Sequence, residues 1–144
     1  MLFTKDYNKG KELMNALRKA ETQEAEEAIL DSLSEFRKSL KAKGDTYNKY
    51  FQLYADAKNR DNACIDFDEC IWEREVPQMV ADIKSFGFRE FTLSSTWSGA
   101  IEVAWLLQKN GCKLVGLVEI NGRDRDYLGT GEPEKKPAYK FEIE

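Results

Sequence analysis

One stretch of the chain, from Phe88 to Ile120, limits most strictly what this sequence can fold into. It contains two apolar runs rich in Leu, Val, Ile, Phe and Thr, which are typical of buried β-strands. Between them lies a hydroxyl-rich turn and an apolar helical segment, in which Ser95 or Thr96 can cap the start and Gly111 can end the helix. A strand, a helix and a strand in this order form a crossover unit, normally right-handed, with parallel strands. The sequence therefore predicts an α/β fold.

Further strand signals lie on both sides of this unit. The segments predicted as strands are Ala63–Phe67, Phe91–Ser94, Leu114–Ile120 and Ala138–Ile143. We expect the first three to be mutually parallel. The last, in which apolar and charged residues alternate, is predicted to be an antiparallel edge strand. The prediction is a small, mostly parallel βαβαβ sheet of three or four strands with one antiparallel edge strand.

The connections in this α/β part have signals of their own. The clearest amphipathic helix begins near Pro77, which suits a first helical turn, and ends at Gly87. Asn121-Gly122 is a strong turn signal. The charged segment Arg123–Lys136 has no periodicity, and we interpret it as a mobile surface loop.

The sequence before the first predicted strand, from about Lys5 to Lys58, is predicted to form helices. Thr22 can cap the second helix, and a tight turn at Gly44-Asp45 joins the second and third helices into an antiparallel hairpin. We expect this N-terminal helical hairpin to pack on the sheet. The whole chain, residues 1–144, is predicted to be a single domain with a helical part (1–60) and an α/β part (61–144).

Three tyrosines, Tyr47, Tyr50 and Tyr54, share one side of the third predicted helix. One interpretation is a docking surface for a partner protein. The other is aromatic packing against the α/β part, as expected of large apolar side chains. The spacing alone is compatible with both.

Charge and composition narrow the classes of function. The chain is acidic, with a net charge of −4, which argues against direct contact with nucleic acid phosphates and suits either basic partner surfaces or simply solubility. Its N-terminus, MLFTKDYNKG, turns polar after three residues, unlike a secretion signal. No apolar run approaches the ~20 residues that a membrane helix needs. We expect no membrane association and a cytoplasmic location.

The residues available for catalysis and metal binding are few. There is no histidine, which excludes a catalytic triad and the mixed cysteine and histidine zinc patterns. The three cysteines, Cys64, Cys70 and Cys112, cannot provide four thiolates or a paired disulfide framework. We expect no metal and no cofactor, and no complete catalytic motif is present.

Two acidic residues and a serine follow the predicted strands. Asp66 and Asp68 come at the end of the first strand, and Ser94 or Ser95 at the end of the second. This arrangement resembles the opening of the haloacid-dehalogenase-like phosphotransferases. The resemblance implies an Asp pair serving as nucleophile and acid with bound Mg²⁺, and a hydroxyl holding the phosphate. Glu69 and Cys70 depart from the small Gly-Thr pair that this family has beside its metal.

The turn between the second strand and its helix has a second interpretation. Its residues are Ser94, Ser95, Thr96, Trp97, Ser98 and Gly99. At a helix N-terminus, backbone N–H groups and the helix dipole favour an anion, which would make this turn a ligand site. Plain capping of the helix explains the same residues.

The run FTLSSTWSGAIEVAWLLQKNGCKLVGLVEIN, within a region from Cys64 to Glu144, resembles small proteins of mobile elements of Gram-positive bacteria. That resemblance implies a genomic setting and no mechanism. The leading hypothesis is a non-enzymatic interaction or regulatory protein with a protein partner, and a homodimer is compatible with it. The alternative is a small phosphate- or nucleotide-handling protein, at the extreme a phosphotransferase that uses Mg²⁺.

Overall fold

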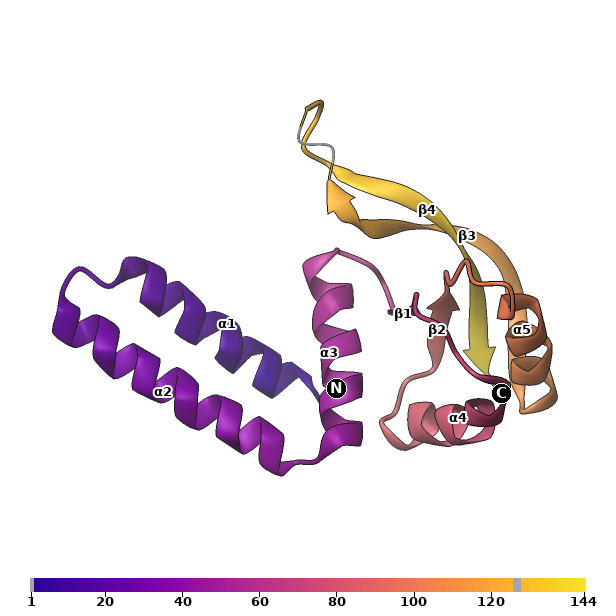
Figure 1. The fold of residues 1–144 in the computed structure, drawn as a ribbon, viewed down its shortest axis with the longest axis horizontal. Helices are drawn as coiled ribbons and strands as arrows, with labels where there is room; N and C mark the ends of the chain where they lie inside the picture. The colour runs from indigo at the N-terminus through magenta and orange to yellow at the C-terminus, as the bar shows by residue number, and fades with distance from the viewer. Residues whose placement is uncertain (1, 126–127) are drawn as a thin grey trace. The chain divides into compact units, whose positions relative to one another are not determined.

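The computed structural model of the protein describes residues 2–125 and 128–144. In chain order the elements are α1 (Thr4–Lys19), α2 (Gln23–Ala42), α3 (Asp45–Asn59), β1 (Ile65–Phe67), the 3₁₀ helix η1 (Glu73–Glu75), α4 (Val76–Ser85), β2 (Glu90–Leu93), α5 (Ala100–Lys109), β3 (Cys112–Arg125) and β4 (Pro133–Ile143) (Figure 1). The chain divides into two compact units, Met1–Gln52 and Leu53–Glu144. The division falls within α3, a few residues before the boundary predicted between the helical and α/β parts.

The first unit is built on an antiparallel pair of helices, α1 and α2 (Figure 1). Thr22 caps α2 as predicted, because its Oγ1 accepts a hydrogen bond from the backbone N–H of Ala25 at 3.1 Å. Gly10 of α1 lies against the ring of Phe36, and a Cβ there would be 3.3 Å from a ring carbon. The absence of a side chain lets the two helices approach closely. The antiparallel pair is therefore α1 with α2, and not α2 with the helix after Gly44.

The second unit contains a four-stranded sheet in the order β1-β2-β4-β3. β1 and β2 are parallel, whereas β4 is antiparallel to both β2 and β3. The three strands predicted to share a direction do so, but the predicted mostly parallel βαβαβ sheet is wrong. β4 is not an edge strand: it lies between β2 and β3. The physical reason is that β3 and β4 are neighbours in sequence and pair along their length, which leaves the other side of β4 to pair with β2.

β3 and β4 extend well beyond the apolar runs from which these strands were predicted. Asn121 pairs with Lys135 and Arg125 pairs with Pro133, so the predicted turn at Asn121-Gly122 lies inside β3. The prediction of a mobile loop over Arg123–Lys136 is wrong at both ends, where residues 123–125 continue β3 and residues 133–136 begin β4; residues 126 and 127 lie outside the described residues. Strand pairing uses backbone groups and does not need apolar side chains, which explains why the charged sequence was misleading.

The core of the second unit lies between the sheet and the helices α4 and α5. Phe91 of β2 stacks on Phe141 of β4 with ring centroids 5.3 Å apart. The buried helix residues are Val76, Met79, Val80 and Ile83 of α4, and Val103, Ala104 and Leu107 of α5. None of the described helices combines the length and the apolar composition that crossing a bilayer would need.

One side of α5 is exposed, although the helix is apolar nearly all round. In the structure α5 packs against α4 and β3, yet Ile101 is 73% exposed and Trp105 is 55% exposed. An apolar pattern records which side chains can be buried, and not how many neighbouring elements are present to bury them.

Candidate functional site

Two sites lie at the carboxyl ends of β1 and β2, and the first is a polar cluster. We call it the strand-end cluster, and its residues are Asp56, Arg60, Asp66, Asp68, Thr92, Ser94 and Arg123. Since β1 and β2 are parallel, their carboxyl ends lie side by side, and Asp66 is the direct neighbour of Thr92. The backbone N–H of Ser94 extends this pairing by donating to the carbonyl of Phe67 at 3.0 Å. The sheet therefore brings together residues that are far apart in sequence.

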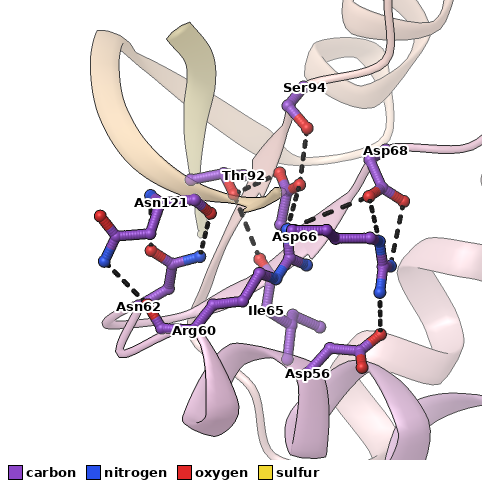
Figure 2. Close-up of polar contacts among 10 residues, drawn as sticks. Asp56, Arg60, Asn62, Ile65, Asp66, Asp68, Thr92, Ser94 and Asn121 are labelled. Carbon is purple, nitrogen blue, oxygen red and sulfur yellow. Dashed lines mark hydrogen bonds and ion pairs between the residues drawn. The ribbon is translucent and has the colours of Figure 1, made fainter. Parts of the chain in front are cut away.

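The centre of the cluster is the carboxylate of Asp66, which is only 1% exposed. Thr92 Oγ1 donates to one of its oxygens at 2.7 Å, and Ser94 Oγ donates to the other at 2.6 Å (Figure 2). Both hydroxyls and the carboxylate are buried, and Nη1 of Arg60 lies 3.9 Å from Asp66 Oδ2. A buried carboxylate needs such partners, because leaving it uncompensated costs several kcal/mol.

The outer part of the cluster is a set of ion pairs around Arg123 of β3. Its Nε donates to Asp68 at 3.0 Å, and its Nη1 donates to Asp56 at 2.9 Å. Burial by itself would raise the pKa of Asp68, but the hydrogen bond and charge of Arg123 and the charge of Arg60 outweigh it and lower that pKa. The hydrogen bond to Asp68 in turn raises the pKa of Arg123. The segment predicted to be a loop is held to the strand ends by these contacts.

Two asparagines attach the same strand to the chain that precedes β1. Asn62 Nδ2 donates to the carbonyl of Asn121 at 3.0 Å, and the backbone N–H of Asn121 donates to Asn62 Oδ1 at 2.9 Å (Figure 2). Asn121 Nδ2 also donates to the carbonyl of Arg60 at 2.7 Å. Asn121 thus has a structural role in the sheet, in place of the turn that its sequence pattern predicts.

The residues resembling a phosphotransferase site meet in this cluster, but they do not fit a bound Mg²⁺. Asp66 and Ser94 converge, and Asp68 is close by. The Arg60 guanidinium, however, lies 3.9 Å from Asp66 and 4.0 Å from Asp68, so a cation already stands between the two carboxylates. Both oxygens of Asp66 accept hydroxyl hydrogen bonds. Within residues 2–125 and 128–144, no three His, Cys, Asp or Glu residues are grouped to hold a metal ion.

The second site is a pocket of about 550 Å³ beside η1 and the start of α5. It is lined by Trp72, Glu73, Arg74, Trp97, Ser98, Gly99 and Glu102. The rings of Trp72 and Trp97 meet edge to face, with centroids 5.2 Å apart and an interplanar angle of 72°. Trp97 lies directly over Gly99, where an added Cβ would be 2.5 Å from Cζ2 of the indole. Only glycine at this position leaves room for the ring.

The turn predicted to bind an anion is divided between the two sites. Ser94 is buried in the strand-end cluster, whereas Trp97, Ser98 and Gly99 line the pocket. Neither Ser95 nor Thr96 caps α5, because the helix starts only at Ala100, with Gly99 at the N-cap and no side chain bonded there. The prediction of a hydroxyl cap was therefore wrong.

The surface next to the pocket is apolar. Trp72 is 48% exposed, and on α5 the exposed residues Ile101 and Trp105 are neighbours one turn apart. Trp105 also lies one turn from the pocket residue Glu102. We call the pocket together with Ile101 and Trp105 the η1–α5 face. A lysine, Lys109, lies 3.7 Å from the centroid of the Trp105 ring.

Comparison with known protein families gives one match, over residues 49–143, to a model described as Domain of unknown function (DUF7698). The match covers about two thirds of the chain. The chain belongs to this family. The DUF7698 match includes both the strand-end cluster and the η1–α5 face. No curated protein and no solved structure matches the chain.

The three tyrosines predicted as an interface lie at the N-terminal limit of the DUF7698 domain. Tyr50 is fully buried and Tyr54 is 7% exposed. Tyr47 is half-buried, with its ring 4.9 Å from that of Phe3 and its hydroxyl donating to Asp6. Their side of α3 therefore presents little exposed ring surface, whereas Trp72 and Trp105, the exposed aromatic residues of the DUF7698 domain among those the structure describes, lie on the η1–α5 face.

Sequence reasoning missed the residues that complete each site. Arg60 and Arg123 carried no motif, since their role depends on how β3 returns across the strand ends. Thr92 could have been found, because it lies two residues before Ser94 and thus on the same face of β2. Trp72 and Glu102 of the pocket are 30 residues apart, and no spacing rule links them.

Proposed function

We propose that this protein is a non-enzymatic interaction protein whose DUF7698 domain binds a partner protein through the η1–α5 face. The observation that carries the proposal is the exposure of Trp72, Ile101 and Trp105 around an open pocket. Tryptophan is among the residues most enriched at the energetic centres of protein interfaces. Exposed apolar residues gathered around a pocket favour binding over a passive surface.

Charge supports a basic partner. The chain has a net charge of −4, and the pocket contributes the carboxylates of Glu73 and Glu102. Surfaces of this sign attract positively charged proteins and repel a nucleic acid backbone. The setting in a bacterial mobile element rests on the sequence resemblance alone and is part of the proposal.

The burial of the strand-end cluster supports a non-enzymatic function. A nucleophilic carboxylate must reach its substrate, and Asp66 is 1% exposed with both oxygens hydrogen-bonded. The ion pairs of Arg60 and Arg123 with the cluster carboxylates hold the strand ends and β3 together. We assign the cluster to stability.

The interaction can be tested by photo-cross-linking in the host cell. A photoreactive residue is placed at Ile101 or at Ser98 on the η1–α5 face, and at Leu30 of α2 as a control; Leu30 is 46% exposed. We expect one partner to cross-link at both positions of the face and not at Leu30. Its capture by the purified chain should fall about tenfold with Trp105→Ala, as for an interface hot spot. Equal labelling at all three positions, or capture unchanged by Trp105→Ala, contradicts the proposal.

The competing function, phosphate handling, is favoured by one observation, the convergence of Asp66 with Ser94 at 2.6 Å. It predicts turnover of a generic phosphate ester with Mg²⁺ that depends on Asp66. We expect the parent protein and Asp66→Asn to give equal background rates, with and without Mg²⁺. A rate that falls with Asp66→Asn while the variant remains folded would replace the interaction proposal for this site.

A further inference from the structure

We infer that the pocket of the η1–α5 face receives an arginine side chain of the partner protein. The inference rests on the proposed function and names the chemistry of the ligand. Three observations carry it: the pair of indole rings, the unpaired carboxylates, and the cations that already contact neighbouring tryptophans of the same face.

The two indole rings form an aromatic corner. Trp72 and Trp97 stand at 72° to one another, and Gly99 fixes Trp97 in place because nothing larger than hydrogen fits beneath the ring. Two indole faces set at an angle can contact a flat cation on two sides. Cations bind over the face of tryptophan within about 6 Å of the ring centroid, and tryptophan is the best residue for this interaction.

Cations of this chain already use the tryptophans of this face. The guanidinium of Arg74 lies 5.6 Å from the Trp72 ring, and Nζ of Lys109 lies 3.7 Å from the Trp105 ring. The side chains of Trp72 and Trp105 are both about half exposed. These contacts indicate that the electrostatic surface of the rings attracts positive charge.

The charges of the pocket are not balanced. Its lining has two carboxylates, Glu73 and Glu102, and one cation, Arg74. Among the described residues neither carboxylate takes part in a hydrogen bond or ion pair, since Glu75 and not Glu73 accepts from the backbone of Trp72. One added positive charge would neutralise the lining, and an anion would face net repulsion. The pocket therefore disfavours the anion predicted for the turn from its sequence.

Arginine fits this combination better than lysine does. Its guanidinium is planar, stacks on aromatic rings and has several N–H donors that can reach two carboxylates, whereas the lysine ammonium is compact and strongly hydrated. A volume of about 550 Å³ is within the usual range of small-ligand pockets and accommodates one such side chain with its adjacent backbone.

The test uses the full chain and three blocked pentapeptides of sequence Gly-Ser-Xaa-Ser-Gly, in which Xaa is arginine, lysine or citrulline. Citrulline has nearly the shape of arginine without its charge. Binding is followed by NMR through the indole Nε1–H resonances of Trp72, Trp97 and Trp105. We expect the arginine peptide to bind with a dissociation constant of about 1 mM and to shift Trp72 and Trp97 most. The lysine peptide should bind about threefold more weakly, and citrulline about tenfold.

Two matched variants distinguish binding to the pocket carboxylates from nonspecific attraction to the acidic surface of the protein. Glu102→Gln removes one pocket carboxylate and should weaken the arginine peptide about threefold to tenfold. Glu119→Gln removes an exposed carboxylate of β3 outside the pocket and should leave binding unchanged. Equal binding of the arginine and citrulline peptides, equal effects of the two Gln variants, or no shift at Trp97 would each overturn the inference. The proposed function fails separately, if cross-linking at Ile101 and Ser98 is no stronger than at Leu30.

Discussion

The strand-end cluster and the η1–α5 pocket are built from the same short segment and differ in how their charges are satisfied. Ser94 belongs to the cluster, and Trp97 to Gly99 belong to the pocket. In the cluster every carboxylate has a hydroxyl or guanidinium partner, and Asp66 is buried. In the pocket the carboxylates have no such partner within residues 2–125 and 128–144, and Trp72 beside them is half exposed. A buried carboxylate that is paired within the protein helps to hold the fold, whereas an exposed carboxylate beside apolar surface is available to a ligand.

This comparison predicts that the two regions respond differently to substitution. Changes in the cluster should lower the free energy of unfolding and leave ligand affinity of the folded protein intact. Changes to the exposed side chains of the η1–α5 face should lower ligand affinity and leave the free energy of unfolding nearly unchanged. The four predictions below are ordered by the expected loss of stability.

The largest effect is expected for Asp66→Ala. The variant removes a buried carboxylate, leaves two hydroxyls without their acceptor, and takes from the buried Arg60 one of the two carboxylates, Asp66 and Asp68, that lie about 4 Å from it. Breaking a buried charge pair by removing one partner costs about 3 to 5 kcal/mol. The measurement is the free energy of unfolding in urea.

Two variants control for this result. Glu119→Ala, at an exposed carboxylate of β3, should change stability by no more than about 0.5 kcal/mol. Asp66→Asn keeps the shape and one acceptor oxygen and should cost less than Asp66→Ala. A loss below about 1 kcal/mol for Asp66→Ala would mean that the cluster is solvated, and the contrast between the two regions would disappear.

Much of the fold follows from local sequence signals. The cap at Thr22, the amphipathic helix after Pro77 and the helix end at Gly87 depend on neighbouring residues, and these predictions were confirmed. The order of strands depends on which backbone edges meet, and charged residues of β3 and β4 pair as well as apolar ones. That is why the position of β4 between β2 and β3 could not be predicted from the pattern of side chains.

Local sequence signals predict the two sites even less completely than they predict the fold. The sequence placed Asp66 and Ser94 at neighbouring strand ends, and the structure brings them together. It could not show that Arg60 stands beside both Asp66 and Asp68, because that depends on the path of the chain between α3 and β1. Nor could it show that the apolar side of α5 with Trp105 has no covering element in the described residues.

The second prediction concerns Gly99→Ala, which affects the pocket through packing. The backbone at Gly99 has a φ of −85°, which alanine adopts without strain, so the effect arises from the methyl group alone. That methyl group would be 2.5 Å from Cζ2 of Trp97 and must displace the ring. Overpacking of this kind costs about 1 to 3 kcal/mol. The ring contact with Trp72 should be lost, which a shift of the Trp97 indole resonance would report.

Ser98→Ala is the control for this variant, because Ser98 is an exposed neighbour in the same pocket. Its stability should stay within about 0.5 kcal/mol of the parent. If Gly99→Ala left both the indole resonance and the arginine peptide affinity unchanged, the position of Trp97 would not depend on the missing side chain, and the aromatic corner would lose its explanation.

The third prediction is a pH effect at the outer part of the cluster. Arg123 lowers the folded-state pKa of Asp68 below its ordinary value of 3.8. A lowered pKa stabilises the folded state at a pH above the unfolded value, and this stabilisation is lost as the pH falls through the folded pKa. Because Arg123 is half exposed, the contribution should be about 1 kcal/mol.

The measurement is the difference in unfolding free energy between the parent and Asp68→Asn, from pH 7 to pH 3. The difference should be constant down to about pH 4 and shrink below it. Asp6 also has a lowered pKa, with Lys43 and Tyr47 as its partners, and taking the difference between two proteins that share Asp6 removes its contribution. A difference that grows below pH 4 would show that Asp68 is not stabilised by Arg123.

The smallest effect on stability is expected for Trp105→Ala. The side chain is 55% exposed and its ring contacts Lys109, four residues further along the same helix. Losing an exposed contact between a cation and an aromatic ring costs about 0.5 kcal/mol, and alanine recovers part of this through its better helix propensity. Unfolding in urea should therefore hardly change, while capture of the partner protein falls about tenfold. Such a result would show that Trp105 contributes to partner binding and hardly to the stability of the fold. A stability loss of about 2 kcal/mol or more would instead place Trp105 in the core of the folded protein, and the η1–α5 face would no longer be a free surface.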